Sequence, residues 1–364
     1  MRLLFISNPN NIHTRRWVSW FARHGHEVCV IGDTRLVEPW PGVELFDLPA
    51  RFDASALRWP AWALWTRQIV HRWRPDVLHA HRVSSAGWLA AASGFHPLVI
   101  TPWGTDLYQH PQRSRLARWL AGFVLRRADL ATADSQDLRR QAIHFGAAAE
   151  RSHVVQWGVD TAVFRPGDSA EWRQRLALGA APVILRPRAV HPIYNLDSIV
   201  AALPAVRASF PGAVLVLRDY NTDAATKAQL QSQIAALRLQ DAVRWVGPLP
   251  RYEDSAGLYC LADVAVSVPT SDGTPVSVLE AMACGAPIVA SDLPSLREWI
   301  TPGDNGLLVL AGDAQALAQA IVELLADPLR RAAFSQRNLD LIRQRADHDV
   351  EMGKMEALYV GLAR

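Results

Sequence analysis

The sequence predicts an α/β protein made of two doubly wound domains, each with a parallel sheet. Short apolar runs alternate with stretches of helical periodicity along most of the 364 residues, which is typical of strands buried between two layers of helices. The alternation restarts after residues 159–179, a stretch that contains Pro166 and Gly167. The sign of the net charge also changes in this region. Residues 1–165 hold 20 basic and 13 acidic residues, whereas residues 166–364 hold 18 basic and 22 acidic residues. This division favours two domains with different partners.

In the first half, strands and helices are expected in strict alternation. Each strand is a short apolar run that ends at a polar residue, a glycine or a proline, and each helix repeats apolar residues every three or four positions. The expected strands are Leu3–Ser7, Glu27–Ile31, Asp76–Ala80, Leu98–Thr101, Leu130–Ala133 and His153–Gln156, and the expected helices are His13–His24, Ala56–Trp73, Ser85–Ala92, Ser114–Arg126 and Ser135–His144.

The second half repeats this rhythm after a linker at Val159–Gly179, and becomes wholly helical from Asp313 onward. Ligands of such sheets bind at the carboxyl ends of the strands, so two facing domains predict a site in the cleft between them. The expected strands are Val183–Leu185, Ala213–Leu217, Val243–Val246, Val264–Val268 and Ile288–Ala290, and the expected helices are Asp197–Ala208, Asp223–Leu237, Asp254–Leu261, Pro275–Cys284 and Pro294–Ile300.

Composition argues against several classes of protein. Cys29, Cys260 and Cys284 lack the spacing of a zinc site, and scattered thiols fit a reducing, cytoplasmic compartment. No apolar run is long enough to cross a membrane as a helix, and the N-terminal run is expected to be a strand and not a signal peptide. The arginines are dispersed and no nucleic-acid-binding motif occurs, so nucleic acid is not an expected partner.

The most informative stretch is residues 267–292, SVPTSDGTPVSVLEAMACGAPIVASD. A strand ends near Pro269, a polar loop carries Asp272, and a helix is expected from Pro275, with Thr274 as its N-cap. A helix that starts at the carboxyl end of a strand offers free N–H groups and a favourable dipole to an anion such as a diphosphate. Glu280 lies in that helix.

This stretch resembles the signature of the family-4 retaining glycosyltransferases, which have the two-domain GT-B fold. Their motif is acidic–Gly–x–Gly, four residues, then Glu-Ala-Met-Ala-x-Gly-x-Pro, and the chain has DGTPVSVLEAMACGAP. Asp272 and Glu280 keep the family's spacing of eight residues. Asp272 stands where the family usually has glutamate, and Pro275 replaces a glycine.

Further segments resemble the same family in the same order. These are HTRRW at residues 13–17, DVLHAH at 76–81, WGTD at 103–106, WGVD at 157–160 and FRP at 164–166. The family's phosphate-binding arginine and lysine have a looser counterpart in residues 185–195, LRPRAVHPIYN, which holds no lysine. Tyr194 or Asn195 falls at the lysine position, and Arg218 is a candidate replacement for its charge.

The resemblance implies a retaining glycosyltransferase that moves a sugar from a UDP- or GDP-sugar to an acceptor hydroxyl, in glycan, glycolipid or polysaccharide biosynthesis. It implies an acceptor-binding domain at 1–163, completed by a C-terminal helix at 350–364, and a donor-binding domain at 164–349. The alternatives are a non-catalytic sugar-nucleotide-binding protein and a sugar-nucleotide epimerase of the same fold. A phosphorylase would need a cofactor-binding lysine, and Lys227 and Lys354 are the only two lysines.

The resemblance also assigns roles to residues. Asp272, Glu280 and Arg188 are expected to be catalytic, with Glu280 on the ribose hydroxyls, Asp272 on the donor sugar and Arg188 on the diphosphate. Neither a metal ion nor a tightly bound cofactor is expected. The remaining donor-binding candidates are Arg186, Tyr194, Gly273, Thr274, Val276 and Ser277, and the acceptor-binding candidates are His13, His81 and Asp106.

A helix at residues 57–74 alternates tryptophans with arginines. This combination suits an anionic membrane surface, so peripheral docking at the inner membrane face is one interpretation, alongside a lipid-linked acceptor. The other interpretation is that the tryptophan stripe packs into the core of the first domain, as periodic aromatic residues usually do.

Overall fold

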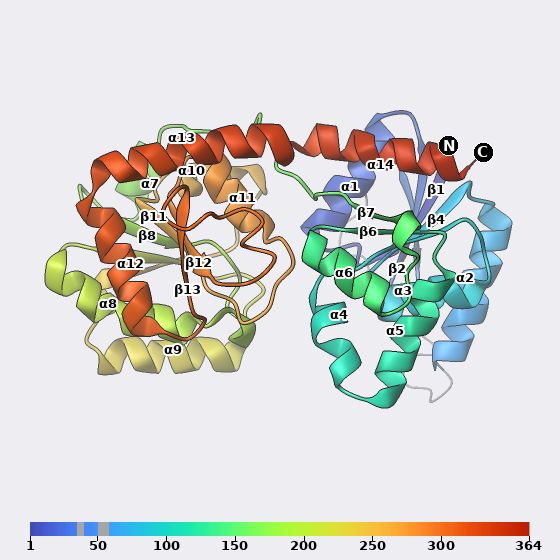
Figure 1. Ribbon diagram of the computed structural model, residues 1–364, viewed down its shortest axis with the longest axis horizontal. Coiled ribbons are helices and arrows are strands. Elements are labelled where there is room, and N and C mark those ends of the chain that lie inside the picture. The colour runs from blue at the N-terminus through green and yellow to red at the C-terminus, as the bar shows by residue number, and fades with distance from the viewer. Residues whose placement is uncertain (35–39, 50–57, 364) are drawn as a thin grey trace. The chain divides into compact units, whose positions relative to one another are not determined.

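The computed structural model describes residues 1–34, 40–49 and 58–363. The chain forms two compact units, each with its own parallel sheet (Figure 1). Unit 1 comprises Met1–Trp157 together with Asp349–Arg364, and unit 2 comprises Gly158–His348. The boundary after residue 157 lies six residues before the one expected at 163.

Within the described residues, the sheet of unit 1 has the strand order β3-β2-β1-β4-β5-β6-β7, with all pairs parallel. Helices lie on both of its faces, as the continuous apolar strands predict. The strands are β1 (Arg2–Ser7), β2 (Glu27–Gly32), β3 (Val43–Asp47), β4 (Val77–His81), β5 (Leu98–Thr101), β6 (Leu130–Ala133) and β7 (Ser152–Val154), and the helices are α1 (Ile12–Arg23), α2 (Arg58–Trp73), α3 (Ser85–Ser93), α4 (Thr105–Tyr108), α5 (Arg115–Arg127) and α6 (Gln136–His144).

Unit 2 has the order β10-β9-β8-β11-β12-β13, again wholly parallel in the part of the chain described. Two apolar clusters pack on its sheet, one on each side. The strands are β8 (Val183–Arg186), β9 (Val214–Arg218), β10 (Val243–Val246), β11 (Val264–Ser267), β12 (Ile288–Ser291) and β13 (Gly306–Val309), and the helices are α7 (Ala170–Arg175), α8 (Leu196–Ser209), α9 (Ala224–Ala236), α10 (Ala256–Tyr259), α11 (Val276–Ala283), α12 (Ala314–Ala326) and α13 (Pro328–Arg345).

Four expectations about these elements need correction. Strand β3 was not expected, because it is a half-buried edge strand with no continuous apolar run. The predicted linker contains helix α7. The predicted helix Pro294–Ile300 is a series of turns, in which the Ser295 hydroxyl donates to the carbonyl of Asp272 at 3.0 Å. The predicted helix Asp254–Leu261 is a 3-10 turn followed by the short α10, and the predicted start of α2 at residues 56 and 57 lies outside the described residues.

The C-terminal helix α14 (His348–Leu362) joins unit 1 from Asp349 onward. Trp20 Nε1 donates to Asp349 at 2.8 Å, and the backbone N–H of Gln156 donates to Glu351 at 2.8 Å. Further along, the Tyr359 hydroxyl is hydrogen-bonded to His79 Nδ1, with Tyr359 fully buried. The last helix therefore supplies core side chains to a unit that begins at residue 1.

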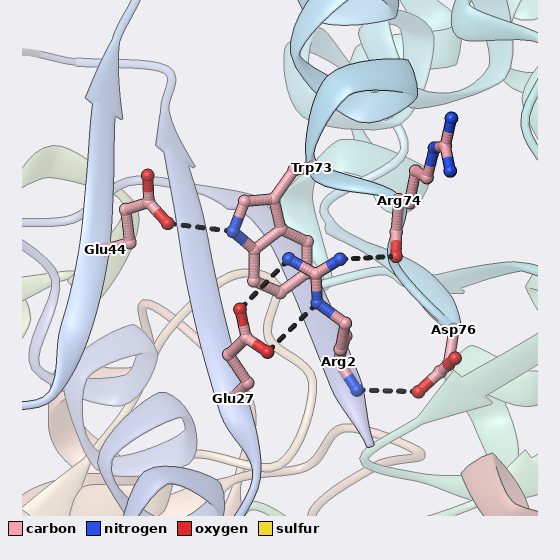
Figure 2. A network of polar contacts seen from close by, with 6 residues as sticks. All are labelled: Arg2, Glu27, Glu44, Trp73, Arg74 and Asp76. Carbon is pink, nitrogen blue, oxygen red and sulfur yellow. Dashed lines mark hydrogen bonds and ion pairs between the residues drawn. The ribbon is translucent and has the colours of Figure 1, made fainter.

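The tryptophans of α2 pack into unit 1 and do not form an exposed stripe. Trp59, Trp62 and Trp65 are partly buried against the apolar cluster of that unit. Figure 2 shows Trp73 at the amino end of the sheet, where its Nε1 donates to Glu44 at 2.8 Å and the Arg2 guanidinium lies 4.4 Å above its ring. The core interpretation of this stripe is the one that the packing supports.

Candidate active site

The candidate donor site of unit 2 lies where parallel strands end side by side. Strands β8 and β9 end at Arg186 and Arg218, and β11, on the other side of β8, leads into the loop that carries Asp272. Helix α11 follows this loop and presents Glu280. Residues far apart in the sequence meet here because the carboxyl ends of parallel strands share one edge of the sheet.

Arg186 and Arg188 lie on either end of a short loop after β8, with the ring of Tyr194 beside both. The guanidinium carbons are 5.1 Å and 4.1 Å from the centroid of the Tyr194 ring. Arg188 Nη2 also donates to the Tyr194 hydroxyl at 3.0 Å. Tyr194, one of the two residues expected at the lysine position of the family, therefore contacts both guanidinium groups and contributes no cation itself.

Asp272 forms an ion pair with Arg188, and the two side chains are 16% and 18% exposed. Burial alone would lower the pKa of Arg188, but the Asp272 carboxylate and the Tyr194 hydroxyl leave that pKa raised above its ordinary value. The structure thus brings together two of the three residues expected to be catalytic. The carboxylate expected to contact the sugar holds the arginine expected to contact the diphosphate.

Glu280 is almost fully buried and accepts hydrogen bonds from two tyrosines. The Tyr252 hydroxyl donates to Oε1, and the Tyr259 hydroxyl donates to Oε2 at 2.5 Å. An ionised carboxylate only accepts hydrogen bonds, and each of its oxygens can accept more than one. Glu280 is therefore the kind of group that binds hydroxyl groups.

Positive charge exceeds negative charge at this edge of the sheet. Arg186, Arg188 and Arg218 supply three guanidinium groups, while Asp272 and Glu280 supply two carboxylates, which leaves one positive charge without a counter-charge. Burial, and then the neighbouring Arg188, lower the pKa of Arg186 to about 9. Arg186 Nη2 and Arg218 Nε have no hydrogen-bond partner among the described residues. Uncompensated buried charge is costly, so the site favours an anionic ligand.

The start of α11 differs in detail from the expectation. Pro275, and not Thr274, is the N-cap, and the Thr274 hydroxyl accepts from Trp299 Nε1 at 3.3 Å. The first backbone hydrogen bond at the start of this helix runs from the N–H of Val278 to the carbonyl of Pro275, at 2.9 Å. The N–H groups of Val276 and Ser277 come before it in the first turn, which is the part of a helix that can offer N–H groups to an anion. Gly273 is buried in the loop just before these groups.

The acceptor candidates of unit 1 lie at the carboxyl ends of its strands, among aromatic rings. His81 is the last residue of β4. A hydrogen bond of 3.2 Å joins its Nδ1 to Ser7 Oγ, and its ring centroid is 5.7 Å from that of Trp103. His13 lies 5.3 Å from Trp157 between ring centroids, and Trp157 lies 4.9 Å from Trp103. His81 and His13 are therefore members of one aromatic cluster.

Asp106 has a positioning role in this cluster. Its Oδ1 accepts from the backbone N–H of Trp103 at 2.8 Å, and its Oδ2 accepts from the backbone N–H of Val83 at 2.6 Å. The side chain is 6% exposed, and burial raises its pKa. Gly104 is the N-cap of α4, so Asp106 is not the capping residue. The carboxylate holds the loops after β4 and β5 together, while its contact with an acceptor stays a prediction.

Acid is expected to destabilise unit 1 through its buried histidines. Burial lowers the pKa of His79, and burial followed by the charges of Arg82 and His13 lowers that of His81 to about 3. Both histidines are neutral in the folded chain. The unfolded chain therefore binds more protons than the folded chain only when the pH is below 6.5, the ordinary pKa of histidine. Stability is therefore full above pH 6.5 and is lost as the pH falls, by about 1.4 kcal/mol per histidine per pH unit.

Urea unfolding between pH 7.5 and pH 5.5 measures this loss. Replacing His81→Asn should remove about half of the slope, whereas the exposed His153→Asn should leave it unchanged. Equal slopes in the wild type and His81→Asn would contradict a titration that involves His81.

Several residues of both sites carry no signal in the sequence. Tyr252 and Tyr259 reach Glu280 from elements 28 and 21 residues away, and no local motif indicates them. Trp17 joins the aromatic cluster at 5.1 Å from Trp157, although the two lie 140 positions apart in the chain. Arg218 is the exception, because an arginine at the end of a strand next to β8 can be found from the pattern of strand ends.

Comparison with known families agrees with the geometry of unit 2. The family model described as glycosyl transferases group 1 matches residues 168–340, and the model described as glycosyl transferase 4-like matches residues 2–135. A D-inositol 3-phosphate glycosyltransferase of Thermobispora bispora is 30% identical over 317 residues, which cover 82% of this chain and 72% of the relative. One of Acidothermus cellulolyticus is 30% identical over 296 residues, which cover 77% of this chain but only 63% of the relative.

Solved structures resemble the chain over its whole length. A crystal structure of Anabaena HepE in complex with UDP and glucose has a TM-score of 0.85 at 22% identity, with complete coverage of both chains. Sucrose-phosphate synthase from Thermosynechococcus elongatus has the same TM-score and identity, covering 100% of this chain and 99% of its own. The chain therefore belongs to the glycosyl transferases group 1 family, the family-4 glycosyltransferases, and has their GT-B fold.

Proposed function

We propose that this chain is a retaining glycosyltransferase that moves a sugar from a nucleotide-diphosphate sugar to an acceptor hydroxyl, in glycan, glycolipid or polysaccharide biosynthesis. Unit 2 binds the donor, and unit 1 binds the acceptor. The observation that carries the proposal is the excess of positive charge from the buried Arg186 and Arg218 and the partly buried Arg188 at the strand ends beside α11. A diphosphate supplies the missing negative charge.

The chemistry follows from the leaving group. As the bond from the sugar to the diphosphate breaks, negative charge grows on the phosphate oxygens, and preorganised donors stabilise it. Arg188 and Arg186 supply charged donors, and the N–H groups of Val276 and Ser277 supply neutral ones. Glu280 accepts from the ribose hydroxyls. Asp272 accepts from hydroxyls of the sugar and orients it once Arg188 turns to the diphosphate.

The identity of donor and acceptor is part of the proposal. HepE was solved with UDP and glucose, which supports a UDP-sugar ahead of a GDP-sugar. The relatives from Acidothermus cellulolyticus and Thermobispora bispora are named D-inositol 3-phosphate glycosyltransferases, which supports a polar, hydroxyl-rich acceptor. The aromatic cluster around His13 and Trp103 offers flat apolar faces and ring nitrogens to such an acceptor. We further propose a lipid-linked acceptor reached from the inner membrane face; among the described residues, no helix is long and apolar enough to span a bilayer.

Two measurements test this function. Thermal unfolding with UDP, GDP and ADP should show the largest rise in Tm with UDP, because a ligand that binds only the folded state stabilises it, by about 2.7 kcal/mol at a hundred times its Kd. Donor turnover should then be detected in EDTA, since we propose no catalytic metal. The single Asp-x-Asp run, Asp347-His348-Asp349, belongs to the junction of the two units, where Asp347 accepts from Thr161 at 2.6 Å. Nucleotide binding without donor turnover would favour the non-catalytic alternative.

Replacing Asp272→Asn is expected to lower kcat at least tenfold while leaving UDP affinity unchanged or higher. The amide orients the sugar less well, but it also releases Arg188 from a competing carboxylate. Calorimetry with UDP and steady-state kinetics separate the two effects. Asp254→Asn, which removes the partner of the exposed Arg251, is the matched control. A loss of UDP affinity as large as the loss of kcat would contradict this placement of Asp272.

A further inference from the structure

Helix α5 has one apolar face in the core of unit 1 and a second face that is exposed at Leu116 and Trp119 and partly buried at Leu120 and Phe123. Ala117, Ala121, Val124 and Leu125 face the core of unit 1. A second stripe at spacing i, i+3, i+4, i+7, the α5 stripe, consists of Leu116, Trp119, Leu120 and Phe123. Leu116 is 64% exposed and Trp119 is 58% exposed. The burial of the first face accounts for the helix, but not for a second row of large apolar side chains.

The α5 stripe is an ordered surface. The rings of Trp119 and Phe123 are stacked, with centroids 5.6 Å apart and planes at 18°. Trp119 is the only tryptophan among the exposed large apolar side chains of the described residues. A lone exposed leucine needs no explanation, but an aromatic pair continuous with an exposed leucine on one helix face marks an interaction surface.

The charge around the stripe has one sign. Residues 113–127 contain no acidic residue, and their five arginines are Arg113, Arg115, Arg118, Arg126 and Arg127. The first four are exposed. Arg127 lies 5.5 Å above the ring of Phe123. Arg113, Arg115 and Arg118 form no ion pair with a carboxylate of the described residues. The partner of this helix must therefore be apolar in its interior and anionic at its surface.

We propose that the α5 stripe docks unit 1 onto a bilayer that contains anionic lipids. Tryptophan, leucine and phenylalanine side chains enter the boundary between headgroups and acyl chains, while the flanking arginines bind lipid phosphates. A second copy of the same face fits poorly, because the two sets of arginines would face each other. The inference places membrane contact on α5, and it rests on the proposed function only in that a lipid-linked acceptor would lie at the same surface.

Vesicle co-sedimentation of the full chain tests the proposal. The chain should bind vesicles of phosphatidylcholine with one third phosphatidylglycerol, and should bind vesicles of phosphatidylcholine alone at least tenfold more weakly. The double variant Leu116→Asn, Trp119→Ser should lose at least tenfold in binding to the anionic vesicles. Leu329→Asn, which removes a leucine 84% exposed on α13, is the matched control and should bind as the wild type does.

Charge and oligomeric state supply the remaining arms of the experiment. Arg115→Gln, Arg118→Gln should weaken binding at low salt, and high salt should weaken binding of the wild type. Equal binding to anionic vesicles by the wild type and the Leu116→Asn, Trp119→Ser variant would overturn the proposal. It would also be overturned if sedimentation velocity showed a dimer for the wild type and a monomer for this variant, with no change in lipid binding. The rise in Tm with UDP must persist in the double variant, so a failure of donor binding is distinguished from a failure of lipid binding.

Discussion

Replacing Arg188→Met is expected to lower kcat about 100- to 1,000-fold, which is the effect of removing one preorganised donor from a developing oxyanion. Asp272 and Tyr194 hold the side chain at the strand ends, and in the proposed mechanism it turns from Asp272 to the diphosphate when the donor binds. Loss of UDP affinity should be smaller, because Arg186 and the start of α11 still bind the ground state. Steady-state kinetics with saturating donor and calorimetry with UDP provide the two numbers.

Two controls define the result for Arg188. Arg251→Met removes another arginine of unit 2 that is paired with an aspartate, but this pair lies at the surface, so kcat should not change. Arg188→Lys keeps the charge without the planar fork and should be intermediate. Wild-type turnover in Arg188→Met would remove this residue from the catalytic set and leave the diphosphate to Arg186 and Arg218.

Replacing Glu280→Gln is expected to reduce UDP affinity about 10- to 100-fold, since hydrogen bonds to a charged group contribute about 1.5–3 kcal/mol. The carboxylate is 4% exposed, and both of its oxygens already accept from tyrosine hydroxyls. An amide has one acceptor oxygen, so its NH₂ group would face one of the two tyrosine donors, and ribose hydroxyls would lose an acceptor. Affinity for inorganic diphosphate should stay nearly constant, because the arginines are untouched.

Folding must be separated from binding in the Glu280 experiment. Tyr252→Phe removes one of the donors while it keeps the carboxylate, so it should lower stability slightly and retain most of the UDP affinity. Glu323→Gln, a half-exposed glutamate paired with Arg330, is the control for charge removal elsewhere in unit 2. Unchanged UDP affinity in a folded Glu280→Gln variant would contradict the ribose role.

The sequence predicts the buried strands well, because a run such as Leu3–Ser7 has no alternative to burial between two helical layers. It fails where tertiary contacts determine the local structure. Strand β3 forms because its neighbour β2 pairs with it along Val43–Asp47, although its own side chains are only half buried. Residues 294–300 turn repeatedly, and one of them, Ser295, binds the carbonyl of Asp272.

The site divides in the same way. Asp272 and Glu280 lie in one local motif, so their spacing can be found from the chain alone. Their partners Ser295, Tyr252 and Tyr259 come from other loops and helices, and nothing in the residue pattern specifies which side chains will meet. Trp73 illustrates the opposite problem, because its alternation with arginines also fits a lipid surface, and only its bond to Glu44 and the position of Arg2 resolve the ambiguity.

The return of α14 to unit 1 has a consequence for biosynthesis. His79 lies in the fourth strand of that unit, yet its hydrogen-bond partner Tyr359 is 280 residues further along the chain. During translation, unit 2 is complete at His348, while unit 1 still lacks the helix that covers its buried histidine. The half of the protein that is synthesised first is therefore completed after the other half, and until α14 has left the ribosome the apolar surface that this helix covers stays exposed.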